Sequence, residues 1–159
     1  MDTLPMKRVA CALLLSLSCF TPTLGGVLTH DRQAEAARAW KPFYAAFRRA
    51  VDRRDRTALR AMMTADLFSS GGVDNNLESA FAYWDESGPR GWPMLSRSLT
   101  RGTVPMDPWW NNGQPHQYPC RVAPPQVNRK GSSYRGKYAI FEFRDDGRWY
   151  CTVFNGCCD

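Results

Sequence analysis

The sequence predicts an α+β domain in which N-terminal helices pack on a curved antiparallel sheet that ends in a C-terminal hairpin. Two observations support this fold class. Up to residue 99, apolar residues recur at three- and four-residue steps, which indicates amphipathic helices. The last third instead carries two apolar segments around Asp145-Asp146-Gly147, a turn sequence typical of a β-hairpin.

Residues 31–51 form the first predicted helix, and Trp40 and Phe47 belong to its apolar stripe. Pro42 interrupts the stripe and has no backbone N–H to donate. It therefore predicts a kink or a fresh helix start at that point. The next helix is expected to begin near Asp55, whose side chain is suited to an N-cap.

Three short elements are expected between residues 66 and 102. Residues 66–70 are predicted to form a strand. A helix follows in which Asn75 and Glu78 have the spacing of a capping box. A fourth helix has Pro93 in its first turn and is expected to stop near Gly102.

The remainder of the chain is predicted to be a proline-rich loop followed by the hairpin. Residues 103–125 predict the loop, with one short strand near residues 118–122. Residues 137–144 and 148–154 are the hairpin strands. Both strands are apolar on both faces, which indicates a central hairpin covered by the helices. The expected faces are Tyr138 and Ile140 against Phe141 and Phe143, and Trp149 and Cys151 against Tyr150 and Phe154.

The first 26 residues have the pattern of a secretory signal peptide. Lys7 and Arg8 precede an apolar stretch over residues 9–20, and small residues follow it. This stretch is too short for a membrane-spanning helix. We therefore expect cleavage near residue 26 and a secreted or periplasmic product. Residues 27–159 are expected to form a single α+β domain without a transmembrane segment.

The formal net charge of +6 favours anionic partners in general. Because export removes the chain from nucleic acid, we expect its partner to be a small ligand or an extracytoplasmic protein instead. An arginine-rich segment over residues 48–60 allows two interpretations. It is either an anion-binding patch or a solvated face that Asp52 and Asp55 partly neutralise. We favour the second.

Four cysteines follow the expected cleavage site: Cys120, Cys151, Cys157 and Cys158. An even number in an exported chain indicates two disulfides. Adjacent Cys157 and Cys158 would pair only in a strained ring, so both bridges are expected to tie the C-terminus to the strands. A zinc site is the alternative, but Cys157-Cys158 lacks the two-residue spacer of thiolate zinc knuckles. No metal or cofactor is expected.

Two stretches resemble the nuclear-transport-factor-2-like superfamily, which includes polyketide-cyclase-like and ketosteroid-isomerase-like proteins. Residues 43–66 resemble its opening, in which two helices lead through an acidic residue into the first strand. Residues 146–154 are similar to the Gly-x-Trp hairpin that closes many such domains. The resemblance implies a cone-like fold with a pocket between the helices and the concave sheet face. A Src-homology-3-like barrel in the C-terminal half, including residues 118–125, is the alternative.

These observations favour an exported, non-enzymatic binding domain. No nucleophile elbow, phosphate loop, dinucleotide fingerprint or His-Glu-x-x-His run is present, and no catalytic residue is assigned. One alternative is an isomerase- or cyclase-like enzyme with Asp66 as base in the same pocket. Another is a protein or cell-wall interaction module that uses Trp109, Trp110 and His116 in the polar loop. The aromatic residues expected to line the pocket are Trp40, Phe43, Phe47, Tyr138, Phe141 and Trp149.

Overall fold

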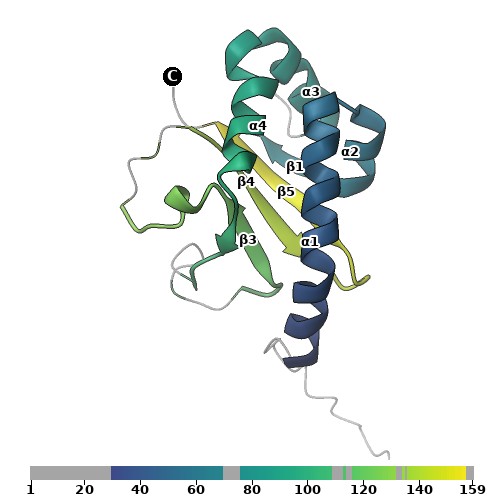
Figure 1. Ribbon diagram of the computed structural model, residues 1–159, viewed down its shortest axis with the longest axis vertical. Helices are drawn as coiled ribbons and strands as arrows, with labels where there is room; N and C mark the ends of the chain where they lie inside the picture. Colours follow the sequence, from purple (N-terminus) through teal and green to yellow (C-terminus); the bar gives the residue numbers. More distant parts are fainter. Residues whose placement is uncertain are drawn as a thin grey trace, which may run out of the picture.

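A computed structural model describes residues 30–69, 76–108, 113, 116–131, 134 and 136–156 (Figure 1). Helices occupy the first half of this part and most of the sheet follows, so the α+β prediction is confirmed. The elements are α1 (His30–Arg53), α2 (Arg56–Met62), β1 (Met63–Ser69), α3 (Leu77–Glu86), η1 (Gly88–Arg90), α4 (Trp92–Thr100), β2 (Val104–Pro105), β3 (Cys120–Ala123), η3 (Pro125–Val127), β4 (Lys137–Phe143) and β5 (Trp149–Gly156).

The five strands form one mixed sheet in the order β1-β5-β4-β3-β2. The β4–β5 hairpin lies near its centre, as predicted, and β2, β3, β4 and β5 pair antiparallel. The expectation of an antiparallel sheet throughout is wrong at one edge, because β1 runs parallel to β5. The long chain between these two strands permits the crossover that parallel neighbours require.

A β-bulge in the hairpin changes which side chains face the helices. The pairing of β4 with β5 shifts between Ile140 and Phe141, and Phe141 lies opposite Cys151. Thr152 is the extra residue of β5, and such a residue bends its strand and increases the local twist. Because of this shift, Phe154 lies in the same core as Cys151. The expectation that Phe154 faces the opposite side is therefore wrong.

The sheet separates two hydrophobic clusters of unequal size. The helices cover one face, as Figure 1 shows for α1, and the main core lies between them and the sheet. A smaller cluster on the other face consists of Val122, Val127 and Ile140, with partly buried side chains around them. The aromatic side chains of the main core that are almost completely buried are Phe47, Phe81, Trp84, Phe141, Phe143 and Phe154.

Helix α1 continues through Pro42 as a single element, so no fresh start occurs there. Pro42 and Arg38 are both exposed. The Arg38 carbonyl that loses its N–H partner is therefore on the water-facing side of the helix. On either side of the proline, Trp40 and Phe47 are buried in the main core. Packing of these two side chains holds the helix together across the break in its hydrogen bonding.

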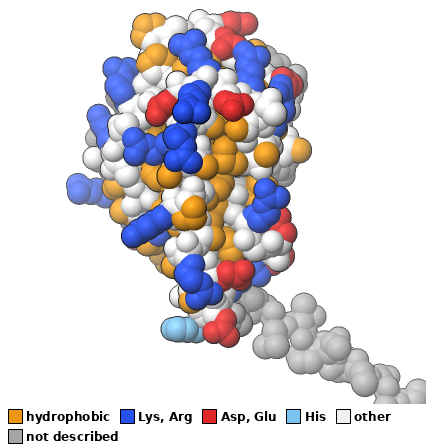
Figure 2. All heavy atoms as spheres, turned by 45° about the vertical axis from the view of Figure 1, so that its right-hand side comes forward, with side chains coloured by type: hydrophobic (Ala, Val, Ile, Leu, Met, Phe, Trp, Pro, Cys, Tyr) orange, Lys and Arg blue, Asp and Glu red, His pale blue; other side chains and the backbone are white. Residues whose placement is uncertain are grey.

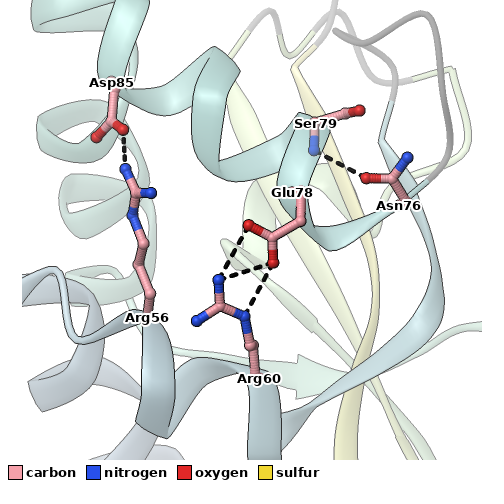
Figure 3. Close-up of polar contacts among 6 residues, drawn as sticks. All are labelled: Arg56, Arg60, Asn76, Glu78, Ser79 and Asp85. Atoms are coloured by element: carbon pink, nitrogen blue, oxygen red, sulfur yellow. Dashed lines mark hydrogen bonds and ion pairs between the residues drawn. The ribbon is translucent and has the colours of Figure 1, made fainter.

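One of the two predicted helix caps is confirmed and the other is shifted. Asp55 caps α2 as predicted, and its Oδ1 accepts a hydrogen bond from the Ala58 N–H at 3.0 Å. The cap of α3 is Asn76, one residue later than expected, and its Oδ1 accepts from the Ser79 N–H at 2.9 Å (Figure 3). Glu78 does not close a capping box. Its carboxylate binds Arg60 of α2 instead.

The expected signal peptide, residues 1–26, lies outside the described residues. Within the described ranges, no helix combines the length and the apolar character needed to cross a bilayer. The longest helix, α1, carries charged residues along its length and packs one side against the sheet.

Candidate functional site

The aromatic residues expected to line a pocket mostly pack against one another. The Trp40 ring centroid lies 4.7 Å from that of Trp149, 5.3 Å from that of Phe141 and 5.8 Å from that of Phe43. The ring centroids of Phe47 and Phe141 lie 5.2 Å apart, with the two rings edge to face. These are the separations of rings in direct contact. The five rings therefore fill the space between the middle of α1 and the sheet.

Tyr138 does not join this group. It packs against the smaller cluster on the far face of the sheet, whereas Phe141 is buried under the helices. Side chains three residues apart on a strand point to opposite faces, because the strand period is two. The expectation that Tyr138 and Phe141 line one pocket is therefore wrong.

A cleft lies beside the aromatic cluster, at the N-terminal end of α1. Its volume is about 390 Å³, within the range of small-molecule sites. One wall comes from the first turns of α1 and the other from β2, β3 and the chain before β3. Trp149 is the one residue that this cleft shares with the expected pocket. The lining residues are Gln33, Ala36, Ala37, Pro105, Met106, Pro108, His116, Tyr118, Pro119, Cys120, Arg121 and Trp149.

Trp149 joins the sheet to the helix at the base of the cleft. Its indole Nε1–H donates to the Ala36 carbonyl at 2.9 Å, in a buried hydrogen bond between β5 and α1. The polar atom of the indole is thereby satisfied inside the protein. What Trp149 offers to the cleft is therefore apolar ring surface.

Arg121 is the charged residue in the cleft wall. It pairs with Pro105 on β2 and with Phe141 on β4, so it lies on the helix-covered face of the sheet. Its Nε–H donates to Thr103 Oγ1 at 3.2 Å, and its Cζ lies 5.0 Å from the Trp40 ring centroid. Burial lowers the pKa of the guanidinium, which nevertheless stays protonated at neutral pH because arginine titrates so far above it.

His116 is the member of the expected interaction loop that the structure describes. Its Nε2 lies 3.1 Å from the Asp107 carbonyl oxygen, and the Gly113 N–H donates to the Pro108 carbonyl at 3.1 Å. These contacts join the chain before and after residues 109–112 at the edge of the cleft. Trp109 and Trp110 themselves lie outside the described residues.

Cys120 is poorly suited to thiol chemistry. Its S–H donates to the Tyr118 carbonyl at 3.1 Å. Burial, reinforced by the negative charge of Glu142, raises the pKa of the Cys120 thiol to about 12. The thiolate is the reactive form of cysteine, so this side chain is inert at neutral pH.

Cys120 and Cys151 are free thiols, and no disulfide joins cysteines within the part of the chain that the structure describes. The two residues lie on strands at opposite sides of β4, which separates them by about 10 Å. Their expected partners, Cys157 and Cys158, lie outside the described residues. β5 stays extended from Cys151 to Gly156, so it carries the chain about 16 Å away from the Cys151 thiol. The expected bridges are thus not seen.

Arginines near the outer edge of the cleft are already neutralised. The Arg32 guanidinium Nη1 lies 2.6 Å from Asp145 Oδ1, and the Arg144 Nη2 lies 2.6 Å from Glu142 Oε2. Both guanidinium groups also contact the Tyr118 ring, with their Cζ atoms 5.6 Å and 5.1 Å from its centroid. Each of these half-buried cations therefore has a carboxylate partner.

Two arginines of the arginine-rich segment at the other end of α1 pair with acids of α3. Figure 3 shows Arg56 and Arg60 of α2 reaching Asp85 and Glu78. Asp52 accepts instead from the Ser96 hydroxyl at 2.6 Å. Figure 2 shows further Lys and Arg side chains spread over this side of the molecule, with acidic and hydrophobic side chains between them. This mixture fits a solvated face better than a single anion-binding patch.

Two other sequence hypotheses find no support in a described side chain. Asp66 belongs to β1, but its side chain lies outside the described part of the molecule. No group of three or more His, Cys, Asp or Glu side chains in the described ranges is placed to hold a metal ion. The cleft is therefore the candidate site.

The chain matches no family model, no curated protein and no solved structure. Its function is therefore argued from the residues of the cleft.

Proposed function

We propose that this protein is an exported, non-enzymatic binding domain that takes a small, largely apolar molecule into the cleft. The observation that carries the proposal is the cleft itself, with a volume of about 390 Å³ beside the aromatic rings that pack against one another under α1. Its walls include Ala37, Pro105, Met106 and the Trp149 ring. Burial of each 200 Å² of apolar ligand surface would contribute about 5 kcal/mol before the costs of association.

The ionisable groups of the cleft favour binding over catalysis. The Cys120 thiol is neutral, and no Asp or Glu is among the described residues that line the cleft. His116 is the one histidine among the described residues that line the cleft. General acid–base chemistry usually needs a second group poised against the first. A site with these residues holds a molecule rather than transforming it.

Export and family belong to the same proposal. The basic and apolar residues at the start of the chain support a periplasmic or extracellular location. The resemblance of residues 43–66 and 146–154 to the nuclear-transport-factor-2-like superfamily supports a ligand site between a helix and a curved sheet. The cleft occupies such a position, between α1 and the strands.

The proposal is tested with an uncharged apolar fluorophore, N-phenyl-1-naphthylamine, and a matched pair of alanine variants. Ala37 lines the cleft and Ala45 does not, although both are exposed on α1. Ala37→Trp would fill the cleft and weaken fluorophore binding at least about tenfold. Ala45→Trp adds the same side chain elsewhere and should leave binding unchanged. The measurement is a fluorescence titration of the purified protein at fixed pH and salt.

Two outcomes would overturn the proposal. One is that the fluorophore does not bind the wild-type protein. The other is that Ala37→Trp and Ala45→Trp behave alike. Native mass spectrometry of the protein from its host's exported fraction is a further check. An added small-molecule mass supports the proposal, whereas a bound protein favours the interaction-module alternative.

A further inference from the structure

We propose that the cleft selects molecules that end in a carboxylate, which the Arg121 guanidinium binds while the apolar remainder lies against the cleft walls. This inference rests on the proposed function and deepens it by naming the ligand class. It depends on three features of Arg121: its unpaired charge, its unused N–H donors and its apolar surroundings.

The charge of Arg121 is not compensated within the described residues. Thr103 accepts from its Nε–H, and the Trp40 ring lies against it, but no carboxylate comes within ion-pair distance. Arg32 and Arg144, the two half-buried arginines that contact the ring of the cleft residue Tyr118, each pair with an acidic side chain. Arg121 therefore differs from its neighbours in lacking an acid, although it is also half-buried.

Tyr44 is the ionisable group that interacts with Arg121, and it supplies no negative charge. Its hydroxyl donates to the Leu99 carbonyl at 2.6 Å. Burial raises the pKa of the Tyr44 phenol to about 12, despite the opposing influence of Arg48 and Arg121. The phenol is thus neutral at physiological pH. A half-buried cation without an anion is unfavourable, and a ligand carboxylate would relieve that cost.

The guanidinium has N–H donors to spare for a carboxylate. One of its five N–H groups, on Nε, is used by Thr103. The four N–H groups of the two terminal nitrogens have no hydrogen-bond partner within the described residues and can donate to two carboxylate oxygens. Contact with the Trp40 ring restricts the side chain and reduces the freedom that binding would remove.

The surroundings of Arg121 determine the rest of the ligand. Pro105 lies beside it on β2, and Ala37 and Trp149 belong to the same cleft. These side chains offer apolar surface, so the body of the ligand should be a chain or ring of hydrocarbon. A medium-length fatty acid or an aromatic acid has this combination of one anionic end and an apolar body.

The test compares octanoate with 1-octanol as competitors of N-phenyl-1-naphthylamine on the full protein. The two competitors share one chain length and differ in charge. We expect octanoate to displace the fluorophore at a concentration at least about tenfold lower than 1-octanol requires. The reason is that hydrogen bonds to charged groups stabilise a complex more than neutral ones do. In Arg121→Gln this preference should vanish while the fluorophore itself still binds. Arg121→Lys should retain part of this preference. Arg101→Gln makes the same charge change at an exposed position that does not line the cleft, and it should retain the whole preference.

The possible outcomes separate the two proposals. If the fluorophore binds but octanoate and octanol compete equally, the carboxylate inference is wrong and the cleft proposal stands. The inference is also wrong if Arg121→Gln keeps the preference for octanoate. If the fluorophore does not bind the wild-type protein at all, the proposed function fails first. Retained fluorophore binding in Arg121→Gln shows that this variant still has an intact cleft.

Discussion

The two ends of α1 differ in how closely the side chains around them are packed and paired. At the C-terminal end, α2, α3 and α4 gather around the helix (Figure 1), and the aromatic rings of this region pack closely against one another. The arginines of α2 there bind acids of α3. At the N-terminal end, the wall of the helix faces a cleft, and Arg121 across from it contacts no acid within the described residues.

This difference separates residues that stabilise the fold from residues available for binding. A cation that is paired with a carboxylate, such as Arg60 with Glu78, is explained by the folded structure itself. Arg121 is a half-buried cation in the wall of the cleft, and the folded chain supplies no carboxylate for it among the described residues. We therefore expect its anionic partner to be a ligand. Substitutions at the C-terminal end should therefore change stability, whereas substitutions in the cleft should change binding.

The largest effect is expected for Trp84→Ala at the C-terminal end. The Trp84 ring centroid lies 4.7 Å from that of Phe154, 4.8 Å from that of Trp92 and 5.5 Å from that of Phe81. Removing this buried ring should lower the free energy of unfolding by roughly 3–5 kcal/mol. Urea denaturation measures the change. Ala37→Trp in the cleft should change the free energy of unfolding by less than about 0.5 kcal/mol. Equal losses in the two variants would contradict the comparison.

The Cys120 thiol, at the edge of the cleft, should react slowly while the protein is folded. A pKa of about 12 reduces its thiolate fraction at pH 8 by roughly a thousandfold relative to an ordinary thiol. Reaction with Ellman's reagent should therefore be far slower in the native protein than in urea. Comparing the wild type with Cys120→Ala identifies the part of the signal that belongs to this residue.

The same reagent shows whether Cys120 or Cys151 takes part in a disulfide. In unfolded, unreduced protein, removal of a free thiol lowers the thiol count by one. Removal of a bridged cysteine raises the count by one, because its partner is released. The structure predicts a decrease for both Cys120→Ala and Cys151→Ala. An increase would restore the two-disulfide interpretation of the sequence.

A smaller effect is expected when the cap of α3 is removed. Asn76→Ala takes away the oxygen that accepts from the Ser79 N–H and should cost about 1 kcal/mol. Asn76→Asp keeps an acceptor oxygen and should cost much less. Both values come from urea denaturation at neutral pH. Because the cap lies far from the cleft in the fold, neither variant should change octanoate binding.

The smallest effect is expected from Asp85 and should depend on pH. The hydrogen bond from Trp92 Nε1, at 2.8 Å, and the charge of Arg56 hold the pKa of the Asp85 carboxyl below its usual range. Its contribution to stability is therefore present above about pH 4, the ordinary value, and lost as the pH falls through the lower folded pKa. Asp85→Asn should destabilise the protein at pH 7, and the difference from wild type should vanish in stronger acid. Glu86→Gln, at an exposed position of the same helix, removes one negative charge but leaves the Trp92–Asp85 hydrogen bond in place and is the control.

The local elements of this fold could largely be predicted from the sequence. Helix caps, such as Asp55, and the hairpin turn at Gly147 depend on a few adjacent residues, so their patterns are readable. Features that depend on distant contacts were missed. The parallel pairing of β1 with β5 and the extra residue Thr152 leave no local mark in the sequence. The fresh helix start that Pro42 allows does not occur, because buried neighbours outweigh the local effect of the proline.

The candidate site was predicted less well than the fold. Large aromatic residues were expected to line a pocket, but such residues are the ones that fill a core most readily. Period-two alternation already places Tyr138 and Phe141 on opposite faces of β4, so that error was avoidable. Arg121 could have been flagged as a charged residue within a short apolar strand. Its missing carboxylate, however, is visible only when the residues around it are assembled.

The most direct test of the comparison is a titration of ¹⁵N-labelled protein with octanoate, followed by amide and indole chemical shifts. If the N-terminal end of α1 holds the binding site, the largest shifts will come from Gln33, Ala37, Tyr118 and the Trp149 indole N–H, which line or border the cleft. The chemical shift of the Trp92 indole N–H, in the core near the C-terminal end of α1, will not change. Shifts concentrated on the arginine-rich residues 48–60, or an absence of saturable shifts, would contradict the account.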